Sequence, residues 1–207
     1  MYIPEYFAAE DADALIARLS RRFAAVLVTV GADGAPTATH APMLWDAERK
    51  VATAHIARAN PQWKDGAGPG LIVLSGPEAY VSPNWYPSKA EHGKAVPTWN
   101  YEAVHITGRV EWFDDAERLR AIVRDLSVRH EEGRDNPWRI EHAPPAYIDA
   151  MLAGIVGFSL RAERVEAKRK LSQNKGESDF LGVREGLAGA GDSGSQEIAD
   201  SMHALRS

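Results

Sequence analysis

Aromatic, cationic and proline residues are concentrated between Tyr80 and Tyr101, in the segment Y-V-S-P-N-W-Y-P-S-K-A-E-H-G-K-A-V-P-T-W-N-Y. Trp and Tyr rings can stack on a planar ligand and hydrogen-bond through their polar tips. Lys89, His92 and Lys94 add positive charge that could meet an anion. The prolines fix backbone angles and remove amide donors, which favours a shaped loop between strands. The segment is typical of a ligand wall, although the same rings could instead cover a hydrophobic core.

Two further segments carry groups that suit an anion. H-I-A-R-A-N-P, from His55 to Pro61, places a guanidinium and an amide at a predicted strand end, beside a predicted helix start. K-R-K-L-S-Q-N-K, from Lys168 to Lys175, combines four cations with hydroxyl and amide side chains. Each segment also has a simpler interpretation, as an arginine-capped surface loop and as a solvated basic turn.

Several classes of chemistry lack their sequence signatures. Neither the dinucleotide-binding nor the P-loop glycine pattern is present, and there is no G-x-S-x-G motif. The chain has no cysteine, which excludes disulfides and thiolate chemistry. The seven histidines show no H-E-x-x-H spacing, so we expect no metal site.

Composition indicates an ordinary globular protein of 207 residues, with 44% hydrophobic and 26% charged residues. A net charge of −5 argues against phosphate-backbone binding by the whole surface. No apolar run approaches the roughly 20 residues that cross a bilayer, and the first residues, M-Y-I-P-E-Y-F, do not resemble a signal peptide. We therefore expect a cytoplasmic location and no membrane partner.

The elements that must position these groups are mostly strands. A helix is predicted over Glu10–Arg22, and short turns then connect strands predicted over Phe23–Val30, Thr37–Trp45 and Val51–Ile56. Later strands are predicted over Leu71–Leu74 with Ala79–Ser82, Trp99–Phe113, and Ile155–Val165. Helices are predicted after the capping box Asp114–Glu117 and near Tyr147–Leu152.

About six strands with peripheral helices predict a mainly β, α+β fold, built as a closed or nearly closed antiparallel barrel. We predict one domain over residues 1–182. Glycines at 182, 186, 189, 191 and 194 predict a flexible tail over residues 183–207, with a weak terminal helix as an option.

Four motifs, in this order, resemble the PaiB-type family of FMN-binding negative transcriptional regulators. They are H-I-A-R-A-N-P-Q-W (55–63), Y-V-S-P-N-W-Y-P-S-K (80–89), V-P-T-W-N-Y (96–101) and K-L-S-Q-N-K (170–175). The resemblance covers roughly residues 1–187. It implies a six-stranded FMN-binding split barrel of the pyridoxamine-phosphate-oxidase type, usually a homodimer with the flavin sites at the subunit interface.

The resemblance also implies a set of flavin-binding residues. His55 and Arg58 would face the flavin phosphate, and Asn60 would orient their loop. The other implied cofactor-binding positions are Thr39, His40, Trp85, Tyr86, Lys89, Thr98, Trp99, Asn100, Lys170, Ser172, Gln173 and Asn174. No catalytic residue is assigned.

The first functional hypothesis is a PaiB-like transcriptional regulator, a repressor that uses flavin as a ligand or redox sensor. Direct DNA contact has little support, because no helix-turn-helix signature is evident. If contact occurs, the cations to suspect are Lys168, Arg169, Lys170 and Lys175. The alternatives are a flavin-dependent oxidoreductase acting on a small planar substrate and a haem-binding split barrel. The possible haem ligands are His40, His55 and His105.

Overall fold

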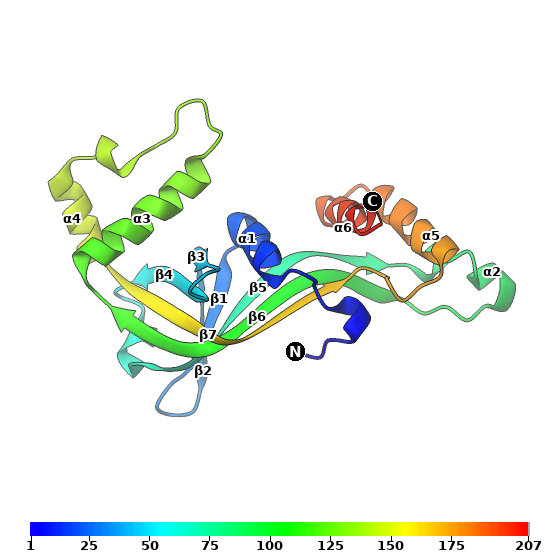
Figure 1. Ribbon diagram of the computed structural model, residues 1–207, viewed down its shortest axis with the longest axis horizontal. Coiled ribbons are helices and arrows are strands. Elements are labelled where there is room, and N and C mark those ends of the chain that lie inside the picture. The colour runs from blue at the N-terminus through cyan, green and yellow to red at the C-terminus, as the bar shows by residue number, and fades with distance from the viewer. Residues whose placement is uncertain (207) are drawn as a thin grey trace. The chain divides into compact units, whose positions relative to one another are not determined.

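A computed structural model describes residues 1–206 and contains seven strands in one antiparallel sheet, with helices around it (Figure 1). The strands are β1 (Ala25–Val30), β2 (Pro36–Ala41), β3 (Met43–Asp46), β4 (Val51–Ala57), β5 (Gly68–Val81), β6 (Thr98–Phe113) and β7 (Ile155–Lys170). The helices are α1 (Ala12–Arg22), α2 (Lys89–His92), α3 (Ala116–Glu131), α4 (Pro145–Ala153), α5 (Glu177–Ala188) and α6 (Ser193–Ala204). Short 3₁₀ helices are η1 (Glu5–Phe7), η2 (Pro61–Asp65), η3 (Pro83–Trp85) and η4 (Ile140–His142).

The chain divides into two compact units. The barrel unit comprises Ala12–Leu74 and His105–Val165. The extension unit comprises Met1–Asp11, Ser75–Val104 and the chain from Glu166 onward. Strands β5, β6 and β7 are long enough to contribute one part to each unit.

In the barrel unit the strand order is β2-β1-β5-β6-β7-β4-β3. Buried side chains alternate along the strands, as in β4, where Ala52, Ala54 and Ile56 face the core. Strand β2 also contacts β4, which brings the two sides of the sheet together as a barrel. The amide of the buried Gln62 donates to the Leu27 carbonyl and the Thr29 hydroxyl, so η2 is fixed to the barrel wall.

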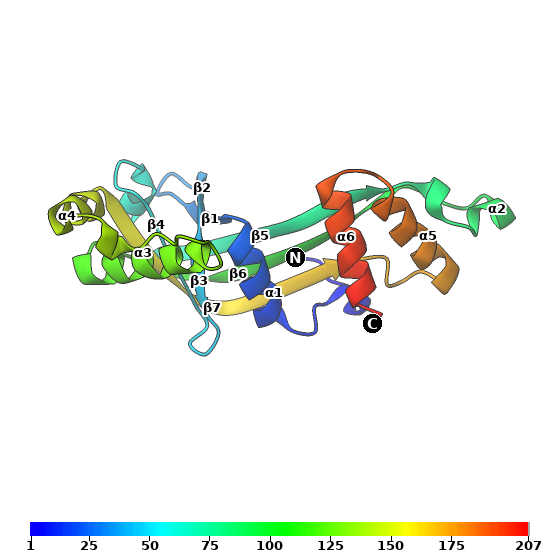
Figure 2. The same ribbon diagram turned by 90° about the horizontal axis from the view of Figure 1, so that it is seen from above.

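In the extension unit, α5 and α6 pack on the paired strands (Figures 1 and 2). Phe180 and Leu187 of α5 are buried with Ile198 and Met202 of α6. The side chain of Asp192 caps α6 by accepting a hydrogen bond from the Ser195 amide at 2.9 Å. These two helices therefore supply much of this unit's hydrophobic core.

The predicted fold class is confirmed, with seven strands in place of six. The extra strand arises because the predicted strand Thr37–Trp45 is interrupted at Pro42, which has no amide hydrogen for a ladder. On one side of Pro42, β2 pairs with β1, and on the other side β3 pairs with β4. A further difference is the capping residue of α3, which is Asp115 and not Asp114.

The structure differs from the predicted flexible tail, because the position of the predicted boundary, residue 182, lies inside α5 and the residues to 204 are largely helical. Two of the glycines serve packing. A Cβ on Gly186 would lie 2.3 Å from the Trp85 ring, and one on Gly182 would lie 2.3 Å from the Trp85 carbonyl oxygen. The glycine content predicted flexibility, but in the structure Gly182 and Gly186 allow α5 to pack closely against Trp85.

Among residues 1–206, no helix is both long enough and apolar enough to cross a membrane.

Shortening the buried Ile198 side chain of α6 should destabilise the protein. We expect Ile198→Ala to lower the free energy of unfolding by about 2–5 kcal/mol, because it removes buried methyl groups and leaves a cavity. Urea denaturation measures this change. The control is Gln196→Ala on the exposed face of the same helix, which should stay within about 0.5 kcal/mol of wild type. Equal effects of the two variants would contradict the packing of α6 described above.

Candidate functional site

His55 lies on β4 with an unpartnered nitrogen. Among the described residues, its Nδ1 is buried and accepts no hydrogen bond. Its strand partner is Gly157 of β7, and a Cβ at Gly157 would overlap the Phe113 ring at 2.3 Å. Burial lowers the pKa of His55, because the cationic ring would lose water without gaining a carboxylate. A ligand group able to donate a hydrogen bond would satisfy this nitrogen.

The chain after β4 is fixed by Arg58 and Asn60. The Arg58 guanidinium donates to the Ala153 carbonyl at 2.8 Å and to the Ile155 carbonyl at 3.1 Å. Asn60 caps η2 through the Gln62 amide, and its own amide donates to the Thr39 hydroxyl at 2.8 Å. The two bonds of the Arg58 guanidinium use two of its five N–H donors, which makes Arg58 a positioning residue for this turn.

A small hollow of about 180 Å³ adjoins this turn, with one side formed by the Arg58 side chain. Its aromatic wall includes Trp63, whose indole nitrogen donates to the Arg58 carbonyl at 2.9 Å. Trp112 and Phe113 complete that wall. Aromatic rings, the Arg58 cation and Asp114 therefore line the same hollow, and this combination suits a planar, polar group.

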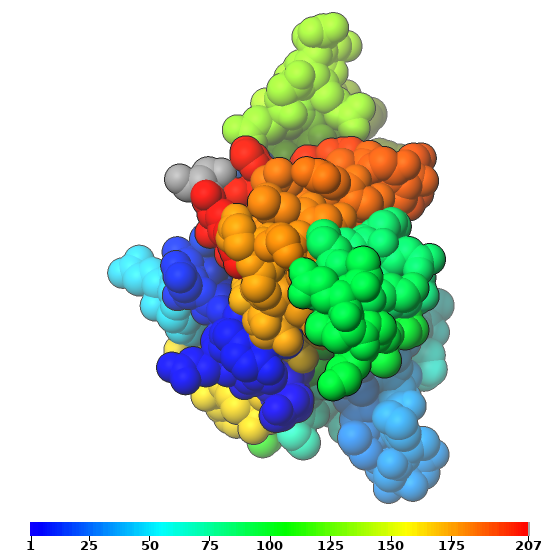
Figure 3. All heavy atoms as spheres, turned by 90° about the vertical axis from the view of Figure 1, so that its right-hand side faces the viewer, coloured from blue at the N-terminus to red at the C-terminus, as the bar shows by residue number. Residues whose placement is uncertain are grey.

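In the extension unit, the loop after β5 packs against α5. Residues 82–100, drawn in green in Figure 3, lie beside the orange α5, and the Ser88 hydroxyl donates to Asp179 at 2.8 Å. The Trp85 ring packs on Gly186. Tyr86 is buried, and among the described residues its hydroxyl has no hydrogen-bond partner. Burial, followed by the charge of Asp179, raises the pKa of Tyr86.

The start of β6 and the end of β7 are joined by polar side chains. The Lys170 ammonium donates to the Thr98 hydroxyl at 2.7 Å and also to the Trp99 carbonyl. Asn100 is fully buried and donates to the Ser172 hydroxyl at 3.0 Å. Ser172 has a φ of 64°, uncommon for a residue with a side chain, and its bonds to Asn100 hold that conformation.

Lysines give this region its positive charge. Burial, and then the charges of Lys168 and Lys175, lower the pKa of Lys170. Lys168 is itself buried, donates to the Tyr2 carbonyl at 3.1 Å and lies 5.1 Å from the centre of the Tyr101 ring. The Lys175 ammonium lies 4.9 Å from the centre of the Tyr86 ring.

The structure brings together some of the predicted site residues. Thr39 meets Asn60 in the barrel unit, and Thr98 and Trp99 meet Lys170 in the extension unit. Others are placed separately. The side chain of His40 is exposed, Lys89 bonds to Asn84, Gln173 bonds to the backbone of its own turn, and Asn174 is exposed. Asn100 is enclosed by Ser172 and Met202, so its side chain does not face an open crevice.

Sequence reasoning missed Gln62. Its amide is bonded to the barrel wall while its Oε1 is buried without a partner among residues 1–206. The available signal was the Asn60-Pro61 pair, which predicts a helix start and hence a fixed position for the residue that follows.

The described residues fit a flavin. Among residues 1–206, buried polar atoms without partners are the His55 Nδ1 and the Gln62 Oε1 in the barrel unit and, separately, the Tyr86 hydroxyl in the extension unit. Such atoms are commonly satisfied by a ligand or water. The Trp99 side chain is 51% exposed, so its ring has a free face for stacking. These are the types of group that bind a planar ring with a polar edge. A bound flavin would supply reversible electron transfer.

These features and the barrel define an FMN-binding split-barrel protein. The sequence profile of the family described as "Putative FMN-binding domain" matches residues 1–164, so the chain belongs to this family and its cofactor is FMN. The chain is 33% identical over 206 residues to "Protease synthase and sporulation protein PAI 2" of Bacillus subtilis, covering 98% of this chain and 96% of that protein. The resemblance to the PaiB-type family is thereby confirmed. An uncharacterized protein of Emericella nidulans is 27% identical over 198 residues, 78% of this chain and 79% of its own.

Solved structures share the fold at low sequence identity. A conserved hypothetical protein from Mycobacterium tuberculosis aligns with a TM-score of 0.58 at 15% identity, over 84% of this chain and 92% of that one. The FAD and heme binding protein from Mycobacterium smegmatis aligns with a TM-score of 0.54 at 16% identity, and the alignment covers 82% of this chain and 76% of that one. The flavocytochrome Anf3 from Azotobacter vinelandii aligns with a TM-score of 0.53 at 18% identity, and the alignment covers 87% of this chain and 78% of that one.

The half-buried His55 should make stability depend on pH. Because its pKa is lowered in the folded protein, the unfolded chain binds a proton that the folded protein does not, once the pH falls below about 6.5. Stability that is present above that pH is therefore lost as the pH falls toward the folded pKa. We expect wild type to lose more stability than His55→Gln between about pH 7.5 and about pH 5.5.

Urea denaturation at the two pH values measures this difference. His40→Gln, which changes the same residue type at an exposed position, is the control and should follow wild type. Parallel pH profiles for wild type and His55→Gln would show that His55 takes up its proton equally in both states.

Proposed function

We propose that this protein is an FMN-binding regulator of gene expression in the cytoplasm, acting as a repressor with the flavin as its ligand or redox sensor. The observation that carries this proposal is the near full-length similarity to PAI 2, whose name connects it with protease synthesis and sporulation. The similarity spans 96% of that protein, so both units of this chain have counterparts in it.

The proposed flavin contacts differ in strength of support. His55 is the best supported position of the barrel unit and Tyr86 that of the extension unit, because each presents a buried polar atom that has no protein partner among residues 1–206. Trp99 and Thr98 follow, since they lie beside the Lys170 ammonium and Trp99 is half exposed. Cations near a flavin stabilise negative charge on the ring or phosphate, so the lysines at this strand end would favour the anionic form.

We also propose that two copies of the chain associate, with the cofactor site at the interface. The support is an apolar patch in the extension unit formed by the adjoining rings of Tyr80 and Trp99, which are 47% and 51% exposed. Val96, three positions before Trp99 in the sequence, is also exposed. The rings of Tyr80 and Trp99 pack edge to face with their centroids 6.1 Å apart. Large exposed aromatic side chains in one place are typical of association surfaces.

The cations between 168 and 175 have little capacity left for DNA. Lys168 and Lys170 donate to backbone carbonyls, and Arg169 pairs with Glu102 at 2.7 Å. Glu102 is buried, so this pair belongs to the core of the extension unit. Lys175 is the exposed member and the cation of this run that a phosphate can reach.

Placing a charge in the apolar patch tests the proposed association. Trp99→Glu should convert the dimer to a monomer and weaken FMN retention by at least about tenfold, because a carboxylate would be buried in the interface without a partner. Gel filtration with light scattering measures the mass, and the flavin absorbance measures retention. Trp138→Glu, at an exposed tryptophan of the barrel unit, is the control. A Trp99→Glu dimer that keeps FMN would refute this interface.

The regulatory role is tested by DNA retention in defined flavin states. We expect the FMN-loaded protein to retain a limited set of DNA fragments from its own genome, and retention to change by at least about tenfold when the flavin is reduced or removed. Lys175→Glu should weaken retention, whereas Glu185→Lys, a charge reversal on the exposed side of α5, should not. Absence of selective retention in every state, together with rapid oxidation of reduced nicotinamide, would instead indicate an oxidoreductase.

A further inference from the structure

The barrel unit contains a second polar cleft, separate from the residues considered for the flavin. This arginine cleft has a volume of about 810 Å³. Five arginines from four parts of the chain line it: Arg49, Arg109, Arg118, Arg129 and Arg161. None of the fifteen proposed flavin-binding residues lines the cleft. Its volume falls in the range of about 300–1,000 Å³ that is usual for small-molecule sites.

The floor of the arginine cleft is the outward face of neighbouring strands. Thr53 of β4 pairs with Ser159 of β7, and both line the cleft with small hydroxyl side chains. Val51 pairs with Arg161 in the same register. Because alternate residues of a strand share a face, β4 and β7 present their short side chains here while Ala52 and Leu160 point into the core. The short side chains leave room for a ligand.

Two arginines of the wall are held in place by the protein. Nη1 of Arg129 donates to the Met43 carbonyl at 2.9 Å and to the Ser20 hydroxyl at 3.4 Å. The Arg118 guanidinium stacks 3.7 Å from the centre of the Phe113 ring. Burial, followed by the charge of Arg21, lowers the pKa of Arg129. Among residues 1–206, Arg129 forms no ion pair.

Two more arginines have no partner at all among residues 1–206. Arg109 of β6 and Arg161 of β7 form neither an ion pair nor a side-chain hydrogen bond, although β6 and β7 are neighbouring strands and both side chains line the cleft. Like charges on one face of adjacent strands repel each other and destabilise the sheet. Glu111 and Glu163 line the same cleft and offer acceptors, but neither is bonded to these arginines. A bound anion would remove the repulsion.

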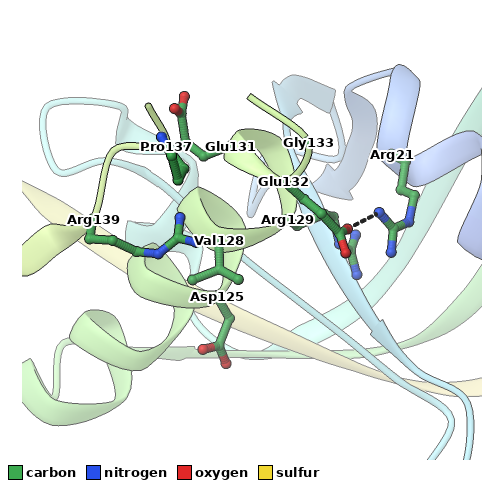
Figure 4. A pocket seen from close by; sticks show the side chains of 9 residues that line it. All are labelled: Arg21, Asp125, Val128, Arg129, Glu131, Glu132, Gly133, Pro137 and Arg139. Carbon is green, nitrogen blue, oxygen red and sulfur yellow. Dashed lines mark hydrogen bonds and ion pairs between the residues drawn. The ribbon is translucent and has the colours of Figure 1, made fainter. Parts of the chain in front are cut away.

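A neighbouring hollow shows the contrast. Figure 4 shows this hollow of about 450 Å³, which shares Asp125 and Arg129 with the arginine cleft. There Arg21 is neutralised by Glu132 at 2.9 Å. In the arginine cleft itself, Arg49 lies 3.8 Å from the Asp46 carboxylate. The protein thus supplies a carboxylate to Arg21 and to Arg49 and, among residues 1–206, leaves Arg109 and Arg161 without one.

We propose that the arginine cleft binds a small ligand that carries at least two anionic groups, phosphate or carboxylate. Arg109 and Arg161 bind one group by charge-assisted hydrogen bonds, and Arg118 and Arg129 bind the other. A nucleic-acid backbone fits this cleft poorly, because four carboxylates, those of Asp46, Glu111, Asp125 and Glu163, also line it and would repel a continuous row of phosphates.

The test uses tripolyphosphate and citrate as probes for the two kinds of anionic group. Isothermal titration of the FMN-loaded protein should show one site per chain for at least one probe, with a dissociation constant below about 1 mM. Arg109→Gln with Arg161→Gln should weaken that binding by roughly 100-fold, about tenfold for each lost contact. Without a probe, the same double variant should be at least as stable as wild type, since it removes like-charge repulsion.

The control is Arg134→Gln with Arg184→Gln, which removes the same charge outside the cleft. It should bind the probe as wild type does. If both double variants lost the same affinity for the probe, the change in net charge alone would explain the loss, and the proposal would be overturned. So would binding of neither probe below about 10 mM, and if DNA retention then depended on Arg109 and Arg161, the cleft would be a nucleic-acid surface. FMN retention should be unchanged in both variants, so failure here is distinct from failure of the flavin site.

Discussion

The alternation of side chains along β6 is the constraint on which the rest of the structure depends. Every second residue from Asn100 to Val110 is buried, including two polar ones, Asn100 and Glu102. This alternation fixes the pairing register of β6, because a shift of one residue would turn all of these side chains outward. The same rule turns Trp99 and Arg109 outward, and these residues carry the proposed association surface and the proposed anion site.

Burial of Glu102 dictates the arrangement of the C-terminal helices. A buried carboxylate needs a cation, and Arg169 of β7 provides one at 2.7 Å. Arg169 also donates to the carbonyl of Ser201, whose hydroxyl contacts the second Glu102 oxygen. Such a pair adds little net stability compared with apolar packing, but it leaves few alternative positions for α6. The helix that this pair orients then buries Ile198 and Met202.

Much of the fold could be predicted from the sequence, because strand periodicity and turn residues are local signals. The long strand over Trp99–Phe113 and the helix after Asp114 agree with β6 and α3 to within a residue or two. The split at Pro42 and the packed glycines of α5 depend on which segments meet, and local composition does not record this. For the candidate site, the motifs located the segments but could not show which polar groups already have a partner. The Tyr86 hydroxyl has none among residues 1–206, whereas Asn100 is bonded to Ser172.

Charge density in the sequence is therefore a poor guide to where this protein can bind an anion. The run from Lys168 to Lys175 is the most basic stretch, yet its first three cations serve the interior of the extension unit. Arg109 and Arg161 lie 52 positions apart in unremarkable strands, and both lack partners among residues 1–206. A cation with an internal partner would have to give up that contact to bind a ligand, while an unpaired one gains a partner without losing one. Partner status, which only the fold reveals, decides which cations remain available for function.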